Sequence, residues 1–177
     1  MALKGDRYEA MTDISFNMNE VAVRGGVACI STVGSGAAMD QSAALCTYVA
    51  TPSGRQPLGI LMNDMVDIDQ TRQHINWYKD EMQKGSKVRL LQKGYVVTNM
   101  IDPGVTITAG DPAYVGPSGY IRNTGGFGSV DGAGTAISGT GAPSYGALIG
   151  RFLSLKDEDG YAKVAVDVPS ISTDVRK

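Results

Sequence analysis

Residues 161–168 have the sequence YAKVAVDV, in which buried-type and surface-type side chains alternate strictly. Every second residue from Ala162 to Val168 is apolar, whereas Lys163 and Asp167 lie between these positions. An alternation with a period of two is typical of a β-strand that has one buried and one solvent-facing side. This segment therefore predicts a half-buried strand.

The residues just before this segment predict its partner in a hairpin. Leu153 and Leu155 alternate with the polar residues Ser154 and Lys156, and residues 157–160 (DEDG) follow as a polar turn. Two alternating runs joined by a short polar turn are typical of a β-hairpin. We therefore expect antiparallel pairing across this turn.

Short apolar runs bounded by glycine, proline or serine recur along the rest of the chain. The expected strands are 21–23, 27–30, 43–50, 58–62, 87–91, 95–100, 105–108 and 113–115. Gly94, Pro103-Gly104 and residues 110–112 are expected to turn the chain between the later strands. Residues 70–84 fit a short helix and an aromatic-anchored excursion equally well. The whole pattern predicts an all-β fold, either a small β-barrel or β-tulip or a jelly-roll-like sandwich.

Two segments lack the pattern of a packed strand. Residues 1–20 carry isolated apolar side chains without a period, which predicts an extended N-terminal arm. Residues 124–147 include eight glycines and few large apolar groups, which predicts a long loop that is functional or disordered. The folded domain then spans residues 21–170, followed by a tail at 171–177. The candidate partner contacts are the large apolar residues of the two segments: Met11, Ile14, Phe16, Met18, Phe127 and Ile137.

The composition excludes several classes of function. The formal net charge is -2, and the 16 Lys and Arg residues are scattered, so the chain lacks the basic field of a nucleic-acid-binding protein. No apolar run approaches the roughly 20 residues that span a bilayer, and no secretory leader is evident. Cys29 and Cys46 lie among small apolar neighbours, so we expect two reduced thiols in the core.

The sequence offers no constellation of catalytic or cofactor-binding side chains. His74 is the one histidine, and no cysteine or second histidine stands at a ligand spacing from it, which argues against a zinc site or a histidine-dependent triad. The turn at residues 157–160 lacks the spaced ligands of a calcium loop, and no phosphate-binding glycine loop is present. We therefore expect no cofactor, no metal and no enzymatic activity.

One enzyme family shares short motifs with the chain. Residues 126–129 (GFGS) resemble the glycine-rich tail motif of trimeric deoxyuridine triphosphatases, and Asp111-x-x-Tyr114-x-Gly116 resembles part of their uracil hairpin. The other motifs of that family, which bind Mg²⁺ and phosphate and orient the water, are missing. A glycan-binding module is a further alternative, because Trp77, Tyr120 or Tyr145 could stack on sugars.

A second resemblance covers about half of the chain. Residues 110–116 (GDPAYVG) with 119–121 (GYI), then 149–153 (IGRFL), then 160–166 (GYAKVAV), occur in the order seen in small capsid decoration, or cement, proteins of tailed bacteriophages. Residues 57–61 and 94–99 are also similar to such head proteins. In that family these segments form a small β-barrel whose trimers sit on the outside of the head.

This resemblance implies a non-enzymatic protein that binds the major capsid protein lattice and stabilises the expanded head. It further implies a homotrimer assembled in the bacterial cytoplasm and carried on the outer surface of the virion. A protein with this task needs buried contact area rather than a catalytic cluster, and three linked contacts strengthen one another through effective concentration. A tail-tube or head-fibre subunit that polymerises with itself is the alternative.

Overall fold

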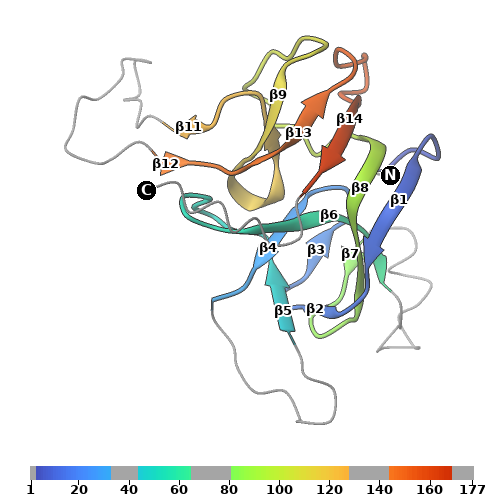
Figure 1. The fold of residues 1–177 in the computed structure, drawn as a ribbon, viewed down its shortest axis with the longest axis vertical. Coiled ribbons are helices and arrows are strands. Elements are labelled where there is room, and N and C mark those ends of the chain that lie inside the picture. Colours follow the sequence, from blue (N-terminus) through green and yellow to red (C-terminus); the bar gives the residue numbers. More distant parts are fainter. Residues whose placement is uncertain (1–2, 33–43, 65–80, 128–143, 169–177) are drawn as a thin grey trace.

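The computed structural model describes residues 3–32, 44–64, 81–127 and 144–168, and β-strands dominate its secondary structure (Figure 1). The strands are β1 (Tyr8–Asp13), β2 (Phe16–Met18), β3 (Ala22–Val23), β4 (Val27–Ile30), β5 (Ala44–Thr47), β6 (Pro57–Asp64), β7 (Glu81–Met82), β8 (Val88–Thr98), β9 (Pro112–Val115), β10 (Ile121–Arg122), β11 (Gly126–Phe127), β12 (Ser144–Tyr145), β13 (Leu148–Phe152) and β14 (Ala162–Asp167). A short 3-10 helix, η3 (Pro117–Gly119), precedes β10. The predicted all-β, sandwich-like fold is confirmed, and the described strands do not close into a barrel.

The long strand β8 joins two smaller layers of one sheet. The strand order is β10-β9-β13-β14-β8-β6-β4-β5-β2, with β1 added to β8. Residues 93–98 of β8 pair with β14, whereas residues 88–91 pair with β6. The layer β10-β9-β13-β14 therefore continues from one half of β8, and the layer β6-β4-β5-β2 continues from the other half (Figure 1).

Both layers curl back towards β8. On one side, the Met18 amide donates to the Ser86 carbonyl, and Asn17 forms a bridge with Lys87 just before β8. On the other side, the Ile121 amide donates to the Met100 carbonyl just after β8. Each layer thus wraps around its own apolar side chains, which a flat sheet of this size would leave exposed.

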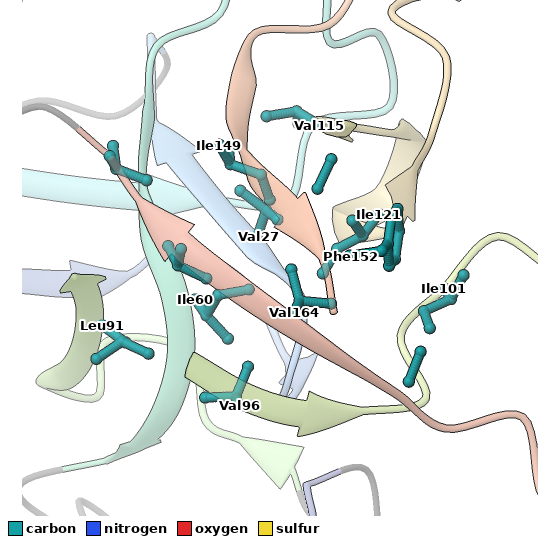
Figure 2. Packing of buried hydrophobic residues seen from close by; sticks show 14 of the residues in the cluster. Val27, Ile60, Leu91, Val96, Ile101, Val115, Ile121, Ile149, Phe152 and Val164 are labelled. Carbon is teal, nitrogen blue, oxygen red and sulfur yellow. The ribbon is translucent and has the colours of Figure 1, made fainter. Parts of the chain in front are cut away.

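The main core lies where the two layers face each other. Phe152, Ile149 and Val164 of one layer and Ile60 and Val27 of the other are completely buried in one cluster. Figure 2 shows these side chains pointing into the same space. Burying a side chain of this size contributes about 1.5–3 kcal/mol, so this cluster is a main source of the fold's stability.

A second cluster explains why some strands have continuous apolar runs. Leu58 and Leu61 of β6 lie in this cluster, whereas Ile60 and Met62 of the same strand lie in the main core. Ala28 of β4 likewise faces the second cluster, away from its two neighbours. These central strands are buried on both sides, which removes the polar half of the alternation.

The C-terminal hairpin matches the sequence prediction. Ala162, Val164, Val166 and Val168 are buried, and the intervening side chains are half-buried or exposed. Phe152 of β13 pairs with Val164, and the Asp157 amide donates to the Tyr161 carbonyl across the turn. The predicted strand at 161–168 and the antiparallel hairpin are therefore confirmed, but the partner strand is β13 and not the predicted run at 153–156, which is irregular.

Three local predictions were wrong. Gly94 lies inside the continuous strand β8 and does not turn the chain between two strands. Residues 105–108 are irregular, although Ile107 is buried in the main core. The described part of the predicted arm, residues 3–20, is not a free arm: β1 pairs with β8, β2 pairs with β5, and Leu3 is buried.

The remaining local predictions concern the cysteines, the glycine-rich loop and the segments outside the described residues. Cys29 and Cys46 are free and buried, and they face different clusters. The base of the expected glycine-rich loop is held by the pairing of β11 with β12. Of the 70–84 segment, Glu81–Met82 form strand β7, which pairs with β3. Residues 65–80, 128–143 and 169–177 lie outside the described part of the chain, so the predictions for residues 70–80, the loop interior and the tail stay predictions.

Candidate interaction surface

The outward side of β9, β13, β14, β8 and β1 forms a single exposed sheet face, which we call the outer face. Directly paired residues of antiparallel strands have side chains on the same side of the sheet. Tyr8 pairs with Tyr95, Tyr95 pairs with Ala165, Ala165 pairs with Arg151, and Arg151 pairs with Pro112. One row of side chains therefore crosses all five strands on this side.

A tyrosine pair and a lysine fix one end of the outer face. The rings of Tyr8 and Tyr95 are 5.9 Å apart between centroids. The Lys163 Nζ lies 4.0 Å from the centroid of the Tyr95 ring and 3.1 Å from a carboxylate oxygen of Asp6. A cation held over an aromatic ring and beside a carboxylate has few alternative positions, so this part of the surface is ordered before any partner binds.

A second lysine repeats this arrangement beside the C-terminal hairpin. The Lys4 Nζ lies 4.2 Å from the centroid of the Tyr161 ring and 2.7 Å from the Asp157 carboxylate. The hydrogen bond from Lys4, together with one from the Tyr161 amide, lowers the pKa of Asp157. The same bond raises the pKa of Lys4. The N-terminal segment is thus tied to the hairpin turn by side chains as well as by strand pairing.

The outer face also exposes large apolar side chains. Tyr8 is 57% exposed, Leu148 55%, Leu153 43% and Met11 40%. Leu148 pairs with Tyr114, and Met11 pairs with Lys93, which places both on the outward side. Exposed apolar groups gathered on one face are typical of a protein-interaction surface.

The structure separates the residues that the sequence marked as partner contacts. Met11 and Ile14 are exposed, Phe16 is half-buried, and Met18 is completely buried in the second cluster. Phe127 lies in β11 at the base of the glycine-rich loop, and Ile137 lies outside the described residues. Met18 therefore has no surface to offer a partner, whereas Met11 joins the outer face.

Sequence reasoning missed Tyr8, Arg151 and Leu153 as surface residues. Tyr8 was assigned to an arm, and Leu153 was assigned to an alternating strand of the hairpin without a prediction of which side faces solvent. The alternation in residues 161–168 did signal an outward side on β14, but the neighbouring strands that extend it across the sheet are far apart in the sequence.

Other kinds of functional site were considered among the described residues: a metal site, a membrane-spanning helix and a catalytic carboxylate. No group of three or more His, Cys, Asp and Glu side chains among them is placed to hold a metal ion. Within the same residues no helix has the length and apolar character needed to cross a membrane. Asp111 belongs to the motif that resembles a uracil-binding hairpin. It accepts hydrogen bonds from the side chain of Asn123 and from the backbone amide and hydroxyl of Thr108. These hydrogen bonds lower the pKa of Asp111. This carboxylate holds a turn.

These features define a structural all-β protein that presents a preorganised aromatic and apolar face. A family model described as structural cement protein (E217 gp24/Pam3 gp6) matches residues 9–166, and the chain belongs to this family of phage proteins. No curated protein matches the sequence. The protein is thus a component of the virion that associates with the capsid lattice and stabilises the phage head. The expected cement identity is confirmed.

Proposed function

We propose that this protein binds the outer surface of the expanded capsid lattice as a homotrimer and has no catalytic role. The family match over residues 9–166 is the observation that carries this proposal. The preorganised outer face supports it, because a cement needs contact area that is already ordered when it meets the lattice. Carboxylates such as Asp111 and Asp157 already accept hydrogen bonds that hold turns or strands together, which favours a structural role over a catalytic one.

A trimer would make weak individual contacts effective. Once one subunit is bound, the second and third contacts become intramolecular, and avidity can exceed a single affinity by about 10²–10⁴. In this proposal Met11 and Ile14 near β1, and the loop residues Phe127 and Ile137, contact the lattice. Phe16 contributes through its exposed part, and Met18 supports β2 from within.

The proposal is tested with DNA-filled expanded heads that lack the protein. Their inner surface is inaccessible, so purified protein that co-sediments with them must occupy the outer surface. We expect saturable binding to these heads, no binding to unexpanded proheads, and a trimer mass by sedimentation equilibrium. Tubes or rings formed without heads would instead support the tail-tube or head-fibre alternative.

A further inference from the structure

We propose that the outer face, through Arg151 of β13, is the surface that docks on the capsid, and that it recognises an acidic carboxylate set among apolar side chains of the lattice. This inference rests on the proposed function. It adds which face of the protein contacts the capsid and which chemical group of the capsid that face binds.

The first argument is the position of Arg151 on the sheet. It lies on β13 between Ala165 of β14 and Pro112 of β9, towards the end of the row opposite to Tyr8. Its side chain is exposed. Arginine and tyrosine are enriched among the interface residues that carry most of the binding energy.

The second argument is the charge that remains available on this face. Lys163 and Lys4 are already paired with Asp6 and Asp157 at 3.1 and 2.7 Å. Arg151 takes part in none of the ion pairs found in the described ranges, and its guanidinium can bind a carboxylate through two parallel hydrogen bonds. The group that completes this face is therefore an anion supplied from outside.

The third argument is the apolar surface that the same face exposes. Four of the nine large hydrophobic residues that are exposed in the described ranges lie on this face: Tyr8, Met11, Leu148 and Leu153. Leu153 directly follows β13, and its amide donates to the Lys163 carbonyl, which holds it at the edge of the row. Leu148 and Leu153 lie before and after Arg151 along the chain, so a carboxylate that contacts Arg151 between them is partly shielded from water, which strengthens the pair.

Charge complementarity favours the lattice over a second copy of the chain. Most described carboxylates are already engaged within the chain, for example Asp13 by Ser15, Glu20 by Tyr48 and Asp102 by Arg122. Within the described ranges a second copy therefore has few free carboxylates to place against Arg151, and the lattice is the partner with which this family associates.

The experiment compares two charge reversals of equal size on intact protein. Arg151→Glu reverses a charge on the outer face, and Lys84→Glu reverses the charge of an exposed turn residue before β8. We expect Arg151→Glu to weaken co-sedimentation with expanded heads at least about tenfold, because each subunit of a multivalent complex loses its contact. Lys84→Glu should bind like the wild type, and both variants should keep the wild-type unfolding midpoint and oligomer mass.

Each other outcome contradicts the inference in a recognisable way. If the wild type and Arg151→Glu bind heads equally, the docking face is elsewhere, and the proposed function stands. If Arg151→Glu changes the oligomer mass without heads present, the face joins subunits to one another. If the wild type does not bind heads, the proposed function itself fails.

Discussion

Gly94 is the residue on which the attachment of the N-terminal segment depends most directly. Its φ is 147°, a conformation that side chains rarely allow, and a Cβ added there would lie 2.0 Å from the Tyr8 carbonyl oxygen. We expect Gly94→Ala to lower the free energy of unfolding by about 1–3 kcal/mol from the backbone conformation alone, with the clash adding to this loss. Urea denaturation measures the change.

The matched control is Gly5→Ala, because a Cβ at Gly5 meets nothing within 4 Å. This variant should unfold within about 0.5 kcal/mol of the wild type. Equal stability of the two variants would show that the Tyr8 backbone does not pack against Gly94.

Asp157 makes the stability of the N-terminal contact depend on pH. Hydrogen bonds from Lys4 and the Tyr161 amide lower its pKa below the ordinary 3.8 in the folded state. A carboxyl with a depressed folded pKa stabilises the protein above its unfolded pKa, and this contribution is lost as the pH falls through the folded pKa. Asp157→Asn should therefore lower Tm at about pH 6 and have little effect at about pH 2.

Thermal melts across this pH range check the prediction, with Asp167→Asn as the control. Asp167 is exposed and contacts Lys93 at 3.8 Å, so its removal changes the net charge equally without breaking a comparable hydrogen-bond network. An Asp157→Asn loss of Tm that is the same at both ends of the range would contradict the assigned role of the carboxylate.

The two cysteines should be nearly inert in the folded protein. Burial raises the pKa of Cys29 and of Cys46 to about 12, so very little thiolate is present at neutral pH. We expect a disulfide reagent at pH 8 to react at least about 1000-fold more slowly than with free cysteine, and both thiols to react promptly in denaturant. Fast release of one chromophore equivalent from native protein would contradict the burial of that thiol.

At the scale of elements, the N-terminal segment is a packed part of the sheet. Leu3 is 7% exposed in the main core, and the Lys4 amide donates to the Val97 carbonyl. We expect Leu3→Ala to cost about 2–5 kcal/mol in the free energy of unfolding. Val21→Ala, at a side chain that is 62% exposed, should cost far less, and urea denaturation of the two variants measures the difference.

If Leu3→Ala proves as stable as the wild type, the segment is not anchored to β8. The arm that the sequence predicted would then describe the N-terminus better than strand β1 does.

The elements that the sequence predicted well are those whose own side chains set the pattern. The alternation of residues 161–168 and the continuous run at 27–30 both correspond to strands. β1 shows no alternation, because it lies at the edge of the sheet and its hydrogen-bonding partner β8 holds it. Glycine occurs both in turns and inside strands where another backbone approaches closely, and Gly94 was interpreted as a turn. The sequence does not show that the Tyr8 backbone lies against Gly94, which is the reason for a glycine inside this strand.

At the scale of the whole molecule, the outer face could not be predicted from the sequence. Tyr8, Tyr95, Arg151 and Ala165 become one row only through strand pairings between distant segments. The cement function was recognisable because its hairpin and turn segments resemble those of capsid proteins. The contact residues were not recognisable from the sequence. Met11 and Met18 are both isolated apolar residues in a segment without a period, and only the fold shows that Met18 is buried and Met11 is exposed.

The most direct measurement is the temperature at which DNA-filled expanded heads lacking the protein release their DNA, followed by a DNA-binding dye as purified protein is added. A structural cement should raise this temperature in proportion to the fraction of lattice sites occupied, and the Arg151→Glu variant should need a much higher concentration for the same rise. Heads that bind the wild-type protein to saturation and still release their DNA at the unprotected temperature would contradict the stabilising function.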